Sequence, residues 1–277
     1  MGSDALTIAA PAKLNLFLEV LGRRADGYHE IDSVFTEIDL ADTVRLEKCD
    51  RIELTAEGLS VPCDATNLAW RAAAALGVGA KIHLIKRIPP GAGLGGGSSD
   101  AAAVLRGLVT LYGLDWPADR LAEAAVTLGA DVPYFLVGGT ARCRGIGELV
   151  ESIQAPRRRT FVLLCPSVSI STTKVYGSLP SVLTGDRETA TVFLRRYLEE
   201  VGPNSPPFHN GLQAPAERLD PRLSALRVAA EAAFDTRFTM TGSGAAYFAE
   251  IGPWLRRGVR FHGITGLAAT QIEVRTR

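Results

Sequence analysis

The most informative stretch of the sequence is the glycine-rich segment Pro89 to Asp100, which reads PPGAGLGGGSSD. An apolar run from Lys81 to Ile88 precedes it, and a helical pattern over 98–112 follows it. Glycine lets the main chain approach a ligand closely and adopt positive φ, and a helix N-terminus offers unpaired N–H donors with a partial positive charge. This order of strand, glycine loop and helix predicts a binding site for a phosphorylated ligand.

Several known phosphate loops do not fit the segment. A Walker A loop needs a lysine after its last glycine, whereas Gly97 is followed by Ser98. The dinucleotide pattern G-x-G-x-x-G fits Gly91 to Gly96, but it also needs an acidic strand end about 20 residues on, and Asp115 lies between two helical segments. Protein kinases need V-A-I-K, H-R-D and D-F-G motifs, which are absent. A plain packing turn would not need two serines after it.

The remaining pattern is P-x-x-x-G-L-G-x-S-S, and residues 89–99 resemble this signature of the GHMP kinase superfamily with one extra glycine. The GLGGGSSDAA form is similar to that of the 4-diphosphocytidyl-2-C-methyl-D-erythritol kinases. The resemblance covers nearly the whole chain, because four more segments occur in the matching order: PAKLNLFLEVLGRRADGYHEI, TLGADVPYFL, PSVSISTTKVYG and TGSGAAYFAE. It implies an α+β, two-domain GHMP kinase fold with the active site in the cleft between the domains.

The same resemblance implies an activity. ATP, with Mg²⁺, would phosphorylate the 2-hydroxyl of 4-diphosphocytidyl-2-C-methyl-D-erythritol, a step of non-mevalonate isoprenoid biosynthesis. A kinase for another small alcohol, of the homoserine or mevalonate type, is the first alternative. A non-catalytic sensor with the GHMP fold is the second, and a nicotinamide oxidoreductase the third.

Composition narrows the possible partners. The chain has 277 residues, 47% of them hydrophobic, and its 30 basic residues balance its 30 acidic ones. Zero net charge argues against nucleic acid or an anionic membrane as the main partner. No signal-peptide core and no run of 18 apolar residues occurs, so we expect a cytoplasmic protein without a membrane segment. A weak homodimer is compatible with the sequence but is not specified by it.

The pattern along the chain predicts two domains, over residues 1–155 and 156–277. Their boundary lies near Pro156, where a turn-rich stretch precedes a new strand pattern. Strand-like alternation dominates residues 6–54, and another strand is expected over 161–165. Helices are expected over 67–76, 98–112, 117–128 and 219–234, and a loop over 202–207.

Two residues are candidates for the chemistry of phosphoryl transfer. A carboxylate beside a lysine can accept a hydroxyl proton, because the cation favours the ionised base. Asp131, in the segment GADVP, reads by itself as a helix N-cap, and the resemblance implies that it is the catalytic base. Lys13 and Asn15 share one face of a strand, about 7 Å apart along it. The resemblance places Lys13 beside the aspartate and Asn15 at the methylerythritol hydroxyls.

The cytidyl group of the implied substrate would bind elsewhere on the chain. The resemblance implies that Tyr28 stacks on cytosine, that His29 bonds the edge of the base, and that Tyr176 covers its other face. Tyr176 stands where a phenylalanine is expected, which adds a hydroxyl that needs a partner. Thr172 is a further candidate substrate ligand. Taken alone, an aromatic residue next to a histidine more often reflects packing.

The glycine loop and two other segments complete the predicted site. The turn TGSG contributes Gly242 and Ser243 to the substrate site by resemblance, although alone it reads as a hairpin turn. Ser98 and Ser99 read as N-caps of the next helix, and the resemblance places one of them near Mg²⁺ and the phosphates; no metal ligand is assigned. The predicted ATP-binding residues are Asn67, Pro89, Pro90, Gly91, Ala92, Gly93, Leu94, Gly95, Gly96, Gly97, Ser98 and Ser99.

Overall fold

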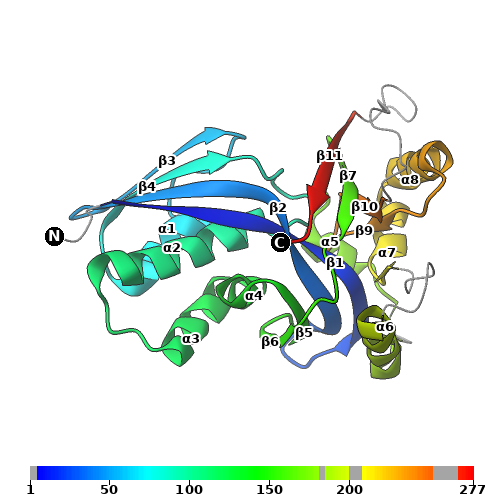
Figure 1. Cartoon of the computed structure of the whole chain (residues 1–277), viewed down its shortest axis with the longest axis horizontal. Coiled ribbons are helices and arrows are strands. Elements are labelled where there is room, and N and C mark those ends of the chain that lie inside the picture. The colour runs from blue at the N-terminus through cyan, green and yellow to red at the C-terminus, as the bar shows by residue number, and fades with distance from the viewer. Residues whose placement is uncertain (1–4, 181–184, 200–207, 252–267) are drawn as a thin grey trace.

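The structure is a computed structural model that describes residues 5–180, 185–199, 208–251 and 268–277. A seven-stranded sheet forms the larger part, with strand order β3-β4-β2-β1-β8, β5 paired with β2, and β6 paired with β5 (Figure 1). Its strands are β1 Ala5–Arg23, β2 His29–Lys48, β3 Ile52–Gly58, β4 Ala80–Lys86, β5 Thr140–Gly145, β6 Leu149–Ile153 and β8 His209–Asn210. Only β3 with β4 and β1 with β8 run parallel among these described pairs.

A second sheet has four antiparallel strands in the order β11-β7-β10-β9. Its strands are β7 Thr160–Pro166, β9 Thr239–Met240, β10 Tyr247–Glu250 and β11 Ala269–Arg275. Mostly antiparallel sheets with helices gathered against them confirm the predicted α+β class. The predicted division at residue 155 stays a prediction, because β8, from the C-terminal half of the chain, pairs with β1.

Helices α1 to α4 lie with the larger sheet, and α6 packs against β1 and β2 of that sheet. Helices α5, α7 and α8 lie with the smaller sheet (Figure 1). Their bounds are α1 Leu68–Leu76, α2 Gly96–Tyr112, α3 Ala118–Leu128, α4 Val132–Val137, α5 Thr172–Gly177, α6 Arg187–Glu199, α7 Gln213–Leu219 and α8 Pro221–Phe234. None of the helices in the described ranges is long and apolar enough to cross a membrane.

Three of the four predicted helices are confirmed, with shifted ends. The side chain of Asn67 caps α1 by accepting from the N–H of Ala69, and Pro117 is the N-cap residue of α3. The prediction of one helix over 219–234 was wrong at its start. The helix cannot include Asp220, because the Asp220 carboxylate caps α8 and Pro221 takes the first helical position. The predicted loop over 202–207 lies outside the described residues.

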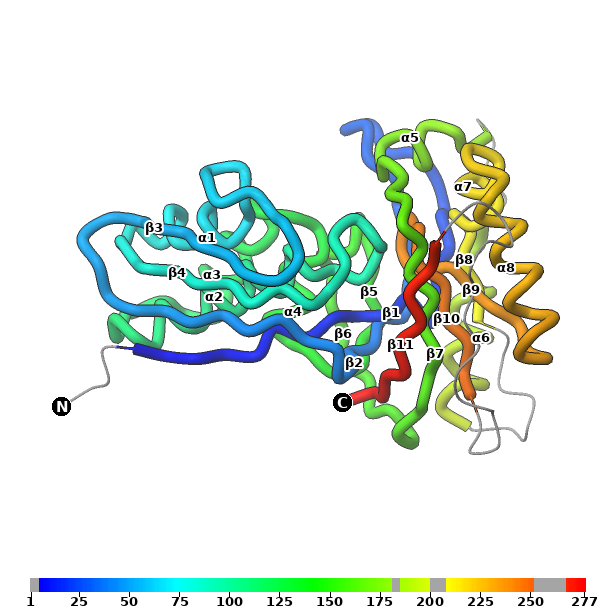
Figure 2. Tube along the Cα trace, turned by 90° about the horizontal axis from the view of Figure 1, so that it is seen from above, coloured from blue at the N-terminus to red at the C-terminus, as the bar shows by residue number. Residues whose placement is uncertain are grey.

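Strands β1 and β2 are long, 19 and 20 residues, and run from one part of the molecule to the other (Figure 2). Residues 10–18 of β1 are all buried, because both faces of this stretch are covered. One apolar cluster packs around α2, and another joins Leu14 and Leu16 to Phe161 and Phe248 of the smaller sheet. Polar side chains on this part of β1 therefore lie inside the molecule.

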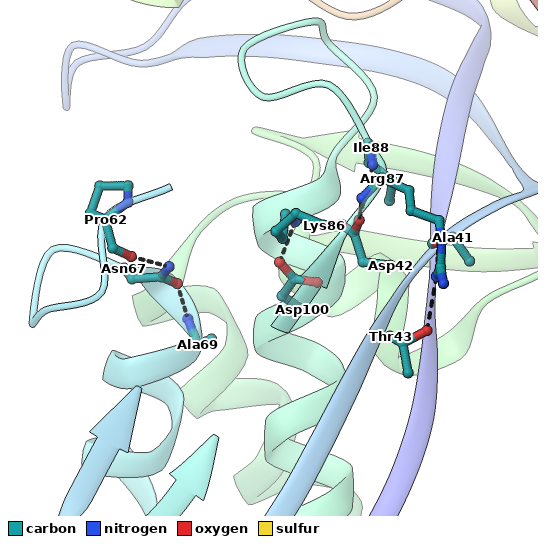
Figure 3. A network of polar contacts seen from close by, with 10 residues as sticks. All are labelled: Ala41, Asp42, Thr43, Pro62, Asn67, Ala69, Lys86, Arg87, Ile88 and Asp100. Carbon is teal, nitrogen blue, oxygen red and sulfur yellow. Dashed lines mark hydrogen bonds and ion pairs between the residues drawn. The ribbon is translucent and has the colours of Figure 1, made fainter. Parts of the chain in front are cut away.

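A buried ion cluster ties β2, β4 and α2 together (Figure 3). The ammonium of Lys86 contacts the carboxylate of Asp42 and lies 2.5 Å from Asp100 Oδ2. The three residues are at most 4% exposed. Burial raises the pKa of the Asp100 carboxyl to about 7; Lys86 opposes this rise and Asp42 adds to it.

Asp100 should therefore make stability depend on pH. Between about pH 4 and 7 the folded protein keeps a proton that the unfolded chain has released, so stability falls as the pH rises, by at most about 1.4 kcal/mol per pH unit. We expect Asp100→Asn to remove this slope from the free energy of unfolding, measured by urea denaturation without nucleotide or metal. The exposed Asp119→Asn is the control and should keep the wild-type slope. Parallel curves for Asp100→Asn and the wild type would contradict the assignment.

Candidate functional site

A cavity of about 770 Å³ is bordered by β1, the glycine loop, α5 and the turn over 242–244. Every residue predicted to be catalytic or to bind the substrate lines it: Lys13, Asn15, Tyr28, His29, Asp131, Thr172, Tyr176, Gly242 and Ser243. These residues come from segments spread over more than 200 positions of the chain. The fold thus brings the two predicted groups together in one space.

A smaller cavity of about 330 Å³ lies along the glycine loop. Asn67 and residues 89–98 line it, so all predicted ATP-binding residues except Ser99 border this space. Gly91, Gly93 and Gly95 border both cavities. The glycine loop is therefore a wall that the two spaces share.

Lys13 and Asp131 face each other in the larger cavity, with Lys13 Nζ 3.5 Å from Asp131 Oδ2. The lysine side chain is 3% exposed and the aspartate side chain 31%. Lys13 Nζ also donates to Asn15 Oδ1 at 2.5 Å and lies 4.6 Å from the centre of the Phe35 ring. A buried ammonium thus has an open carboxylate beside it, which can still meet a ligand.

The N-cap interpretation of Asp131 was wrong for its side chain. Asp131 does precede α4, but its backbone is already helical, at φ −86° and ψ −12°, and its carboxylate caps no N–H. Capping side chains usually need an extended backbone at that position. Because the cap is not made, the carboxylate is available to Lys13.

Asn15 is the centre of a buried hydrogen-bond network. Its Nδ2 donates to Ser33 Oγ at 3.1 Å, and its backbone N–H donates to Thr241 Oγ1 at 3.1 Å. The Thr241 hydroxyl lies 3.2 Å from Asn15 Oδ1 and 3.4 Å from the carbonyl of Gly93. Neither Ser33 nor Thr241 was predicted as a site residue, although Thr241 is the first residue of the predicted TGSG turn.

A third polar residue that the sequence did not suggest holds the 242–244 turn. Asn210 Nδ2 donates to the carbonyls of Met240 and Gly242 at 2.6 and 2.8 Å, and Asn210 Oδ1 accepts from the N–H of Leu212. Asn210 is 7% exposed and belongs to β8, beside β1. No signal in the sequence distinguishes Asn210 from the other asparagines of the chain.

The glycine loop has the backbone that its sequence predicts. Gly91, Gly93 and Gly95 have φ between 67° and 78°, where other residues are strained. A Cβ on Gly93 would lie 2.2 Å from the carbonyl oxygen of Thr241, so the loop and the turn could not approach as they do. Backbone N–H groups of such a loop can meet a phosphate closely.

The interpretation of Ser98 and Ser99 as N-cap residues was wrong. Because α2 begins at Gly96, with Gly95 as its N-cap residue, Ser98 and Ser99 lie inside the first turn. Ser98 borders the smaller cavity, whereas Ser99 is 1% exposed and its Oγ has no hydrogen-bond partner among the described residues. Asn67 borders the same cavity, but its amide is engaged with Pro62 and Ala69.

The other end of the larger cavity is aromatic. The rings of His29 and Tyr176 are in contact, 5.1 Å between centroids at a 33° angle, and Tyr28 is 59% exposed. Burial, and then the nearby Arg23, lower the pKa of His29 below its ordinary value. The lowered pKa of His29 favours the neutral imidazole, which presents one donor and one acceptor. Arg23 also lines the cavity and was not predicted.

Comparison with known proteins supports the resemblance. The family model of the GHMP kinases N terminal domain matches residues 67–139. A 4-diphosphocytidyl-2-C-methyl-D-erythritol kinase of Geobacter sulfurreducens is 42% identical, over 88% of this chain and 89% of that protein. One from Variovorax paradoxus is 41% identical, over 88% of this chain and 86% of that protein.

Solved structures agree with these relatives. A 4-(cytidine 5'-diphospho)-2C-methyl-D-erythritol kinase superposes with a TM-score of 0.76 at 36% identity, covering 98% of this chain and 99% of that one. A homoserine kinase from Cytophaga hutchinsonii has a TM-score of 0.69 at 19% identity, covering 98% and 94%, and shows the shared fold alone. The chain therefore belongs to the 4-diphosphocytidyl-2-C-methyl-D-erythritol kinase family of the GHMP kinases.

Proposed function

We propose that this kinase transfers the γ-phosphoryl group of ATP to the 2-hydroxyl of 4-diphosphocytidyl-2-C-methyl-D-erythritol. One observation carries the proposal. The Lys13–Asp131 pair lies in the cavity that reaches the His29–Tyr176 contact, and the same cavity shares the glycine loop with the smaller one. An alcohol in the larger cavity and a triphosphate in the smaller one would meet at this loop.

Asp131 would act as the general base. Its carboxylate takes the proton of the substrate hydroxyl while the hydroxyl oxygen bonds to the γ-phosphorus, and the bond from that phosphorus to the β–γ bridging oxygen breaks to release ADP. Lys13 would favour the ionised form of Asp131 and stabilise negative charge on the attacking oxygen. Its bonds to Asn15 and Asp131 hold the ammonium in place for this role.

The glycine loop would hold the phosphates of ATP through its backbone N–H groups and the N-terminus of α2. Mg²⁺, when bound with ATP, would neutralise phosphate charge. The nearby protein oxygens fit such an ion, because Ser99 Oγ is buried without a partner among the described residues and Ser98 borders the cavity. One of these two serines would help to hold it.

The aromatic end would select the cytidyl group. A neutral His29 can match the donor and acceptor pattern of a cytosine edge, and Tyr28 and Tyr176 offer ring faces for stacking. Thr172 and Ser243, whose hydroxyl oxygens lie 2.7 Å apart, would orient the part of the substrate between the base and the alcohol.

The alternatives fit the chain less well. A kinase for homoserine or mevalonate has no use for the His29–Tyr176 end, and the structures of such kinases share 19% identity or less with this chain. A non-catalytic sensor would not need the Lys13–Asp131 pair. The decisive assay is ADP release with a panel of alcohols that includes diphosphocytidyl-methylerythritol, homoserine and mevalonate; equal rates on all three would refute the proposed substrate.

Removing the base should stop turnover without unfolding the protein. We expect Asp131→Asn to lower kcat at least about 100-fold, the low end for the loss of a general base. Binding of an ATP analogue, measured by calorimetry, should be unchanged, because Asp131 does not border the smaller cavity. A variant with near-normal kcat would leave the catalytic base unidentified.

Removing the cytosine contact should affect only substrates that carry the cytidyl group. We expect His29→Ala to lower kcat/KM for the cytidyl substrate about tenfold, the upper range for one lost hydrogen bond, with ATP affinity unchanged. Tyr176→Ala should cost about 5- to 150-fold, as expected for a lost stacking face. Tyr176→Phe keeps the ring and is the matched control, with kcat/KM within about twofold of the wild type.

Methylerythritol monophosphate provides the second control, because it lacks the cytidyl group. Its phosphorylation should be very slow and should not respond to His29→Ala. If it reacts as well as the cytidyl substrate, the assignment of the aromatic end is wrong while the kinase chemistry can stand.

A further inference from the structure

The buried cluster of Asp42, Lys86 and Asp100 lies where the glycine loop begins and ends (Figure 3). Lys86 is the last residue of β4, and the glycine-rich segment begins three residues later, at Pro89. Asp100 lies in α2, four residues after the helix begins at Gly96. Through its ammonium, Lys86 thus links the end of β4, before the loop, to helix α2, after the loop.

Asp42 holds the start of the loop through the backbone. Its Oδ1 accepts from the N–H groups of Arg87 and Ile88, at 2.5 and 2.9 Å, while its Oδ2 contacts Lys86 (Figure 3). Hydrogen bonds from two successive N–H groups to one carboxylate oxygen fix the direction in which the chain leaves β4. Asp42 is itself buried and lies in β2, so a long strand of the larger sheet fixes the direction of the chain at this point.

The two ends of the loop also lie close together. A Cβ on Gly96 would be 2.9 Å from the side chain of Ile88 and 3.4 Å from Asp42 Oδ2. Any movement of Asp42 or Lys86 therefore reaches the start and the end of the loop at once. Lys86 and Asp100 both border the smaller cavity, where we place the nucleotide.

Stability alone does not account for this cluster. Buried ion pairs cost desolvation, and well-packed apolar residues often stabilise as much or more. The cluster also has more carboxylates than cations, and Asp100 Oδ1 has no hydrogen-bond partner among the described residues. A buried polar atom without a partner is costly. The arrangement is better suited to fixing one geometry than to maximising the free energy of unfolding.

We propose that Asp42, Lys86 and Asp100 are positioning residues for the nucleotide: together they fix both ends of the glycine loop, so that its N–H groups are arranged before ATP binds. A loop held in its binding shape loses less conformational freedom on binding. The inference rests on the proposed binding of ATP at this loop. It assigns the cluster an effect on nucleotide affinity that a purely structural role would not have.

Asp42→Asn tests the proposal, because the new amide keeps the shape but brings an N–H₂ donor against the Lys86 ammonium. We expect the Kd for ATP, measured by calorimetry, to rise at least about tenfold. Amide hydrogen exchange over 91–97 should accelerate, and exchange in α8 should not change. The Kd of the cytidyl substrate should stay within about twofold of the wild type.

Asp39→Asn is the matched control, since Asp39 lies on the same strand and also accepts from a backbone N–H, that of Arg275. It does not border the smaller cavity and should bind ATP like the wild type. If Asp42→Asn does not fold, Asp100→Ala replaces it. This variant removes the contact of Lys86 with α2 but keeps the Lys86–Asp42 pair, and it should weaken ATP binding at least about threefold.

The outcomes separate the two proposals. A folded Asp42→Asn or Asp100→Ala protein with wild-type ATP affinity and loop exchange would overturn the positioning role, even if its melting temperature fell. A wild-type protein that does not bind ATP would instead refute the proposed function.

Discussion

The site depends on one buried charge, the ammonium group of Lys13. Its side chain is 3% exposed, and an ammonium removed from water needs partners nearby. It finds them in Asn15 Oδ1 at 2.5 Å, Asp131 Oδ2 at 3.5 Å and the Phe35 ring at 4.6 Å. Moving the lysine would disturb β1, the start of α4 and β2 together. The positions of the catalytic groups are thus tied to the core of the protein.

The chain has a second buried lysine, and the comparison shows what distinguishes a reactive pair from a structural one. The carboxylates beside Lys86 are at most 3% exposed, and both face its ammonium. The carboxylate beside Lys13 is 31% exposed and borders a cavity. Both lysines hold carboxylates, but only the first leaves its partner open to a ligand. Lys13 and Asp131 border the larger cavity and Lys86 and Asp100 the smaller one, and the glycine loop borders both.

Backbone contacts join that loop to both sheets. The N–H of Lys13 donates to the carbonyl of Leu94 at 3.0 Å, and the N–H of Ala246 donates to the carbonyl of Ala92 at 3.1 Å. The Thr241 hydroxyl lies near the carbonyl of Gly93, and the side-chain amide of Asn210 donates to the carbonyl of Gly242 in the turn. Because β1 and the 242–244 turn also border the larger cavity, the spaces proposed for nucleotide and acceptor share their walls. The aromatic end comes from other segments, around residue 29 and in α5, and the hydrogen bond between Thr172 and Ser243 links α5 to the turn.

Local signals in the sequence determined a large part of this protein. The glycines of the loop specify positive φ, Asn67 and Gly129 mark helix ends, and the 3.6-residue period marks α2. Their causes act within a few residues, so they can be read along the chain. The motifs also selected the residues that line the larger cavity. The break at Asp220 was readable from Asp-Pro but was missed in favour of apolar periodicity.

The tertiary structure decided which polar groups meet. Asp42, Lys86 and Asp100 are far apart in sequence, and only the register of β2 with β4 and the packing of α2 bring them together. Asn210 and Thr241 acquire their roles in the same way, from β8 and from the turn after β9. The sequence allowed Asp131 to be a helix N-cap or a catalytic base, and its backbone angles and missing cap bond excluded a capping side chain. A hydrogen bond between distant residues depends on strand register and burial, which no short stretch of sequence contains.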